Sequence, residues 1–176
     1  MLLRDPVHGL VAFEGRAERV IDALLATREV QRLRRVKQLG LTSLVFPGAE
    51  HTRFAHALGA AHVMLRLQAR IVAAQHDLPK DVQLDDAAAD EALAAALLHD
   101  LGHGPFSHLY EEVSPHPRHH EAWTEDVLLD SGTDVNRALE GLSAGMAERV
   151  AGMLKGRHRL GYLSRAISGT IDVDRA

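Results

Sequence analysis

The chain has 176 residues, no cysteine and a net charge of −4, with 46% hydrophobic and 25% charged residues. This length and composition fit one globular domain that needs no disulfide bonds, and they exclude a disordered or collagen-like chain. The negative charge argues against a strongly basic nucleic-acid coat, and the longest apolar stretch, residues 92–98, is far too short to cross a bilayer. We therefore expect a soluble, cytoplasmic protein without membrane contact.

The first part of the chain predicts a small hairpin followed by helices. Residues 2–14 carry Pro6 and Gly9 between short apolar pieces, which is typical of two extended segments around a turn. After these residues the hydrophobic spacing is helical. One apolar stripe covers residues 16–26, and a second continues over residues 30–39 and ends at a glycine.

The rest of the chain predicts helices as well. A long helix is expected from Arg53 to about His76, and an alanine-rich helix from about Ala88 to Leu101. Another helix covers residues 119–129, and two or three more continue through Ile167. The pattern therefore predicts an all-α fold, a helical bundle with a short N-terminal β-hairpin.

Histidine is unusually concentrated, since six of the twelve histidines lie between His99 and His120. His99 and Asp100 stand side by side at the end of the apolar helix, where an unpaired ionised carboxylate would be costly to bury. A divalent cation would compensate both groups, because imidazole and carboxylate are good metal ligands. His103 follows four residues after His99 and shares its helical face if the helix continues that far.

One metal ion needs more ligands than this adjacent pair provides. His56 is a candidate near the start of the long helix, and the Asp-Val-Asp sequence at 172–174 offers a further carboxylate. From the residues alone, both aspartates of this sequence remain candidates.

Several ordered segments carry a resemblance to a known family. They read Arg-Asp-Pro-Val-His-Gly at 4–9, Gln-Arg-Leu-Arg-Arg-Val-Lys-Gln-Leu-Gly at 31–40, Phe-Pro-Gly-Ala-Glu-His-Thr-Arg-Phe-Ala-His at 46–56, Leu-His-Asp-Leu-Gly-His-Gly-Pro-Phe-Ser-His at 98–108, His-Glu at 120–121 and Ile-Asp-Val-Asp-Arg at 171–175. Together they resemble the His-Asp (HD) phosphohydrolase superfamily, and within it the deoxynucleoside triphosphate (dNTP) triphosphohydrolases. The resemblance implies an HD-domain helical bundle.

The resemblance also implies roles for individual residues. One divalent metal ion would be coordinated by His56, His99, Asp100 and Asp174. This ligand set suits Mn, Fe or Zn, and Mg less well. The catalytic side chains would be those of His103, His108, His120 and Glu121, with His108 as general acid and His103 on the phosphate. The substrate would be bound by Gln38, Leu39, Arg53 and Arg175.

The function that the resemblance implies is hydrolysis of a dNTP to a deoxynucleoside and triphosphate. Two alternatives stay open. One is another HD activity, a nucleoside monophosphatase or a phosphodiesterase, and the other is a regulatory domain that binds nucleotide or nucleic acid with little or no turnover. The basic run from Arg28 to Lys37 is either a solvated helix face or the site of a regulatory nucleotide or nucleic acid.

The resemblance covers most of the chain, so we expect residues 1–176 to form a single HD domain. The core of the family that the chain resembles is longer, so we expect this domain to be truncated at its C-terminal end. We also expect a homo-oligomer in the full-length form.

Overall fold

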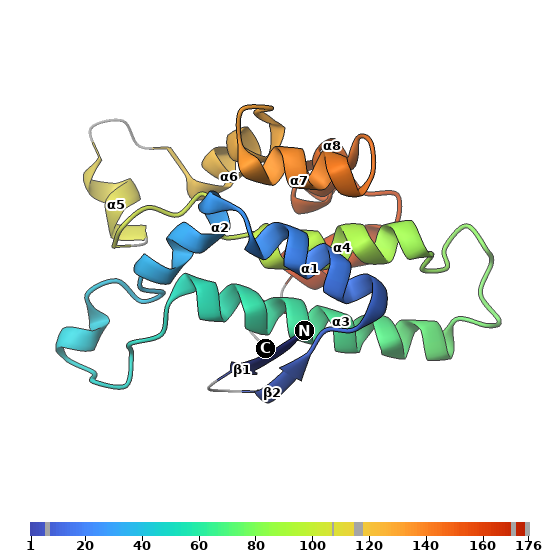
Figure 1. Cartoon of the computed structure of the whole chain (residues 1–176), viewed down its shortest axis with the longest axis horizontal. Helices are drawn as coiled ribbons and strands as arrows, with labels where there is room; N and C mark the ends of the chain where they lie inside the picture. The colour runs from blue at the N-terminus through green and yellow to red at the C-terminus, as the bar shows by residue number, and fades with distance from the viewer. Residues whose placement is uncertain (6–7, 107, 115–117, 170–171, 175–176) are drawn as a thin grey trace.

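A computed structural model describes residues 1–5, 8–106, 108–114, 118–169 and 172–174. Within these residues the fold is mainly helical, with one two-stranded sheet at the N-terminus, as Figure 1 shows. The prediction of an all-α bundle with a short hairpin is therefore confirmed. None of the described helices combines the length and the hydropathy needed to cross a membrane.

The hairpin consists of β1 (Leu2–Asp5) and β2 (Gly9–Ala12), which pair antiparallel with Leu3 opposite Val11. Val11 is buried while Leu10 is exposed, the alternation expected of a sheet with one face on the core. The N-terminal amine donates to the carbonyl of Phe13 (2.8 Å). The hairpin thereby closes one side of the bundle, next to α3.

The first helices are α1 (Gly15–Leu25) and α2 (Arg28–Arg32), followed by the short 3₁₀ turns η1 (Leu33–Arg35) and η2 (Thr42–Leu44). The predicted helix over residues 30–39 is therefore too long.

The reason is a competing backbone pairing beyond η1. Val36 is extended, and its carbonyl accepts from the N–H of Arg53 (2.8 Å), while the N–H of Gln38 donates to the carbonyl of His51 (3.1 Å). Val30, Leu33 and Val36 are all buried nevertheless. These three apolar residues therefore do face the core, but the helical part of the segment ends at Arg35.

The centre of the molecule is made by α3 (Arg53–Ala74) and α4 (Asp86–Leu98). The N-terminus of α4 is capped by Asp85, whose carboxylate accepts from the N–H of Ala88 (2.9 Å). Nearly every residue of α4 is buried, because α1, α3, α8 and α9 all pack around it. Its alanines allow this close approach on every side, and both helices begin or end at the candidate site.

The remaining described helices are α5 (His108–Val113), α6 (His120–Leu129), α7 (Asp134–Leu142), α8 (Met146–Leu154) and α9 (Gly161–Ser168). The sequence pattern did not predict α5, which has no buried residue. Figure 1 shows α5 at the edge of the molecule, away from the packed helices.

The end of α4 differs from the prediction that this helix reaches Leu101. The helix ends at Leu98, and the chain then turns toward α6. Gly102 permits the turn, since a Cβ there would lie 2.1 Å from the carbonyl oxygen of His120, and its N–H donates to Thr124 Oγ1 (2.8 Å). His99 and His103 therefore do not share a helical face, and the turn instead brings both toward α6.

Candidate active site

Four side chains from three distant segments of the sequence meet where α3, the end of α4 and the segment after α9 come together. His56 Nε2 lies 2.7 Å from Asp174 Oδ1, and His99 Nε2 lies 3.2 Å from the same oxygen. The two Nε2 atoms are 3.3 Å apart. Asp100 completes the set, which we call the metal group, and one ligand atom from each of the four residues lies within 4.8 Å of the others.

The chemistry of these atoms fits a bound cation. The Nδ1 of His99 faces the carbonyl of Ala96 at 2.9 Å, and because a carbonyl can only accept, Nδ1 carries the proton of the neutral ring. The Nε2 lone pair of His99 then points at a carboxylate oxygen and at a second imidazole nitrogen. Three electron-rich atoms in contact require a proton or a metal ion between them. The metal group could therefore hold a divalent ion.

The charges of the metal group agree with this. With a proton rather than a metal ion between these atoms, His99 carries a positive charge. Burial favours protonation of Asp100, but the hydrogen bond from His103 and the charges of His99 and Arg53 outweigh it and hold the pKa of Asp100 well below its usual range. Hydrogen bonds from His56 and His99 hold the pKa of Asp174 low as well. Both carboxylates are therefore ionised at neutral pH, the form that binds metal.

Arg53 contacts the metal group from the buried side. Its guanidinium pairs with Asp100 Oδ2, and both side chains are buried, at 3% and 8% exposure. Because Arg53 holds one oxygen of Asp100, the other oxygen faces His99 Nε2 (3.6 Å) and His103 Nε2 (3.4 Å). In this structure Arg53 orients Asp100, and its contact with substrate phosphate stays a prediction.

A second cluster lies beside the metal group and contains His103, His108, Glu111 and His120, which we call the histidine group. The rings of His103 and His120 stack with centroids 3.7 Å apart and planes 15° apart. Glu111 Oε1 lies 2.8 Å from His120 Nδ1 and also accepts from the backbone N–H of His120 (3.2 Å). Since an ionised carboxylate only accepts, Nδ1 of His120 carries a proton and its Nε2 is left for other partners.

Glu111 is the functional residue that the sequence reasoning missed. The resemblance named Glu121 beside His120 as a catalytic side chain and did not name Glu111, whereas the carboxylate in contact with His120 belongs to Glu111 on α5. The available signal was the spacing of His108 and Glu111, three residues apart and so on one face of a helix. His108 itself is 67% exposed, and its Nδ1 lies 3.9 Å from Glu111.

His103 connects the two groups. It is almost fully buried, with Nε2 on Asp100 and its ring on His120. Its other nitrogen, Nδ1, has no hydrogen-bond partner within the described part of the chain. Burial lowers the pKa of His103 despite the hydrogen bond to Asp100. This side chain is therefore neutral at neutral pH and presents an unsatisfied nitrogen at the junction of the groups.

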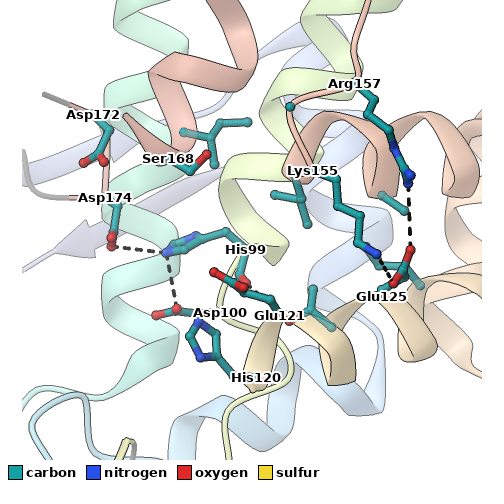
Figure 2. Close-up of a pocket in the computed structure, with 16 residues that line it drawn as sticks. His99, Asp100, His120, Glu121, Glu125, Lys155, Arg157, Ser168, Asp172 and Asp174 are labelled. Atoms are coloured by element: carbon teal, nitrogen blue, oxygen red, sulfur yellow. Dashed lines mark hydrogen bonds and ion pairs between the residues drawn. The ribbon is translucent and has the colours of Figure 1, made fainter. Parts of the chain in front are cut away.

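The metal group and, from the histidine group, His120 open on one cavity of about 780 Å³, a size typical of small-ligand sites. Its walls come from α6, the end of α8, α9 and the segment after α9, and His99, Asp100, His120 and Asp174 all line it. Figure 2 shows these side chains together on one side of the cavity. Glu121 also lines it and is exposed.

The other predicted substrate residues are not brought to this cavity in the described structure. Gln38 and Leu39 lie in the segment between η1 and η2, and Leu39 is 47% exposed. Neither they nor Arg53 are among the described residues that line the cavity. Arg175 lies outside the described residues. Their roles in substrate binding stay predictions.

The basic run from Arg28 to Lys37 has partners within the chain for most of its cations. Arg28 pairs with Asp134, and Lys37 pairs with Glu50. Arg32 donates to the carbonyl oxygens of Leu101 (2.6 Å) and His103 (2.9 Å), and the guanidinium of Arg34 stacks on Phe54. Arg32 thus supports the turn that follows α4. Binding of a regulatory nucleotide or nucleic acid at this run stays a prediction.

Comparison with known proteins identifies the family. The HD domain family matches residues 53–161. Over 174 residues the chain is 40% identical to the uncharacterized protein YwfO of Bacillus subtilis, covering 99% of this chain and 37% of YwfO. Human SAMHD1, a deoxynucleoside triphosphate triphosphohydrolase, is 37% identical over 126 residues, which cover 71% of this chain and 19% of SAMHD1.

Solved structures agree with this match. A phosphohydrolase from Bacteroides thetaiotaomicron superimposes with a TM-score of 0.78 at 30% identity, covering 99% of this chain and 40% of that one. A hypothetical protein from Aquifex aeolicus gives a TM-score of 0.74 at 35% identity, with 99% and 43% covered. The chain thus spans less than half of the length of each relative. Its sequence, its fold and the adjacent His99 and Asp100 place it in the HD-domain phosphohydrolase superfamily.

Proposed function

We propose that this chain is a metal-dependent nucleotide phosphohydrolase that converts a dNTP into a deoxynucleoside and triphosphate. The observation that carries the proposal is that residues of the metal group and His120, which Glu111 orients, line one cavity. The likeness to proteins named as deoxynucleoside triphosphate triphosphohydrolases supports the choice of substrate.

The metal group would hold one divalent ion through His56, His99, Asp100 and Asp174. Its mixture of imidazole and carboxylate ligands favours Mn, Fe or Zn over Mg, which prefers oxygen ligands. When bound, such an ion supplies Lewis-acid chemistry by neutralising phosphate charge and making water more acidic. Arg53 and His103 would orient the metal ligand Asp100, because each contacts one oxygen of its carboxylate.

His120 is the best supported residue for proton transfer. Glu111 holds its Nδ1–H at 2.8 Å, which fixes the tautomer and the ring plane, and His120 lines the cavity. Its Nε2 would exchange a proton with water or with the leaving oxygen, a role suited to an imidazole near neutral pH. His108, whose Nδ1 lies 3.9 Å from the same carboxylate and whose side chain is more exposed, is a second candidate for this role.

In the proposed reaction water adds to the α-phosphorus and the bond from this phosphorus to the 5′ oxygen breaks. The deoxynucleoside leaves with a proton on that oxygen, and the three phosphates leave together. Monophosphatase activity would instead release inorganic phosphate, and phosphodiesterase activity a nucleotide.

The test is incubation of the Mn-loaded protein with each dNTP, a nucleoside monophosphate and a phosphodiester, followed by chromatography of the products. We expect deoxynucleoside and triphosphate in equal amounts. Release of inorganic phosphate from the monophosphate, or of a nucleotide from the phosphodiester, without triphosphate would contradict the proposed reaction and favour another HD activity. Nucleotide binding without any turnover would instead favour the regulatory domain.

A further inference from the structure

The cavity has a second charged region, away from the metal group. Lys155 and Arg157 follow the end of α8, and both line the cavity. The ammonium of Lys155 pairs with Glu125 on α6, and Nη2 of Arg157 lies 3.9 Å from the other oxygen of the same carboxylate. Figure 2 shows the three side chains together on the side of the cavity opposite Asp174. We call Lys155 and Arg157 the cationic pair.

The local backbone explains why both cations face the same way. Gly156 between them has a φ of 74°, the left-handed conformation in which glycine commonly ends a helix. The N–H of Arg157 donates to the carbonyl of Gly152 (2.8 Å), and that of Gly156 to Met153 (3.1 Å). This compact end of α8 leaves the two flanking side chains directed at one carboxylate.

The next residue anchors this turn to the core. His158 has a side-chain exposure of 5%, and its Nε2 lies 3.0 Å from Oε2 of the buried Glu91 on α4. The Nδ1 of His158 accepts from the N–H of Leu160 (3.1 Å), so Nε2 carries the proton and donates to Glu91. Glu91 also accepts from Arg149 Nε (2.5 Å). The cationic pair therefore lies on a rigid segment rather than on a loose loop, which lowers the entropy lost on binding.

The charge of the cavity changes from one side to the other. The side of the metal group carries the carboxylates of Asp100, Asp172 and Asp174. On the opposite side, Glu125 is the ion-pair partner that the described residues give to both cations, so these three side chains together carry one excess positive charge. The 3.9 Å separation is longer than a hydrogen bond, so Glu125 does not use the guanidinium donors of Arg157. A planar guanidinium and an ammonium together are well suited to phosphate oxygens.

We propose that the cationic pair binds the phosphates of the substrate that are distal to the metal group, so that the cavity selects nucleotides with a polyphosphate chain over monophosphates. This rests on the proposed function, since it presumes that the reacting phosphate lies at the metal group. An isolated surface ion pair would contribute little to either stability or binding. Here the pair lines the same cavity as the catalytic candidates.

Binding of inorganic tripolyphosphate to the Mn-loaded protein, measured by calorimetry, tests this without turnover. We expect K155Q and R157Q each to weaken tripolyphosphate binding about tenfold and to change binding of inorganic phosphate much less. The matched control is R159Q on the same turn, since Arg159 pairs with Asp85 and is not among the residues that line this cavity. Its affinity should match that of the unmodified protein.

The substitution E125Q separates binding from a structural role. Without this carboxylate, Lys155 and Arg157 have no competing negative charge, so tripolyphosphate should bind several-fold more tightly. This change in affinity is opposite in direction to the change expected for K155Q. A purely structural ion pair predicts instead that E125Q and K155Q both lower the Tm and leave affinity alone. In turnover assays K155Q and R157Q should raise the KM for a dNTP with little change in kcat.

Failure of the proposed function and failure of this inference have different results. A protein that binds tripolyphosphate through Lys155 and Arg157 but turns over no nucleotide would contradict only the proposed function. Tripolyphosphate affinities within twofold of each other for the unmodified protein, K155Q and R157Q would overturn the cationic pair as a phosphate subsite, whatever the activity.

Discussion

His56 lies on the central helix α3 and His99 directly follows the last residue of α4, whereas His108 and Glu111 lie on α5, a six-residue helix without a buried residue. The side chains of His56 and His99 are only 17% and 12% exposed, and the surrounding α4 is packed on all sides. On α5, His108 is 67% exposed. The packing of the core thus fixes His56 and His99 of the metal group, while α5 meets the site through the contact between Glu111 and His120.

This comparison predicts that the metal group is preformed and that the two members of the histidine group on α5, His108 and Glu111, are adjustable. Sites built on packed helices hold their geometry without the ligand, and sites on surface segments often tighten only when substrate binds. The substitutions below test this difference, beginning with the largest expected effect.

Removing a residue of the metal group should abolish activity. His99→Ala deletes a ligand atom at the centre of the group, so we expect metal affinity to fall by more than about 100-fold and turnover to disappear. Metal content by mass spectrometry and the Tm with and without Mn measure this. The exposed His76 provides the control, since His76→Ala should keep both metal and activity. Full metal occupancy in His99→Ala would refute the assignment of this ligand.

The two histidines that share Glu111 should differ in their effect. We expect His120→Ala to lower kcat by about 100-fold or more, because general acid–base catalysis contributes at least that much. His108→Ala should lower kcat by about tenfold or less, since this exposed side chain lacks a hydrogen-bonding distance to Glu111. Glu111→Gln should lie between them. If His108→Ala had the larger effect, α5 would have to close over the substrate, and His108 would be the general acid.

The turn after α4 should tolerate no side chain at position 102. In Gly102→Ala the new Cβ would meet the backbone of His120 at 2.1 Å and of Thr124 at 2.4 Å, so we expect a loss of about 3 kcal/mol or more in the free energy of unfolding. Gly141, inside α7 with open space around it, is the matched control, and Gly141→Ala should stabilise by up to about 1 kcal/mol. Urea unfolding of both variants measures the difference, and equal stabilities would contradict the close contact with α6.

An exposed ion pair outside both groups gives the smallest effect. Hydrogen bonds from Arg28 and Arg137 lower the pKa of Asp134 to about 2. Because this pKa is lower than in the unfolded chain, the stabilisation is present above about pH 4 and is lost as the pH falls toward 2. The Tm difference between the unmodified protein and Asp134→Asn should therefore shrink over this range. If this Tm difference grew on acidification, the pKa of Asp134 would be raised in the folded protein rather than lowered, contrary to the prediction.

The sequence indicated much of this arrangement but not all of it. Helical spacing predicted the central helices, because their apolar faces are long and regular, and the resemblance supplied the four residues of the metal group. The residues alone could not decide between Asp172 and Asp174. The choice depends on the path of the chain after α9, which places the carboxylate of Asp174 next to His56.

The misses have physical reasons as well. The helix over residues 30–39 was interrupted by pairing of Val36 with Arg53, a contact between segments that no local pattern reveals. Glu111 was not among the predicted site residues, because only the fold brings it from nine residues earlier into contact with His120. The close contact of Gly102 with α6 likewise depends on tertiary packing, and it belongs to a turn that leaves both His99 and His103 beyond the end of α4.

The most direct test of the account is a crystal structure of the Mn-loaded protein with anomalous scattering measured at the manganese edge. We predict one strong anomalous peak at ligand distance, about 2 Å, from His56 Nε2, His99 Nε2 and carboxylate oxygens of Asp100 and Asp174. A single peak within the histidine group, or no peak at the metal group, would contradict the assignment on which the proposed function rests.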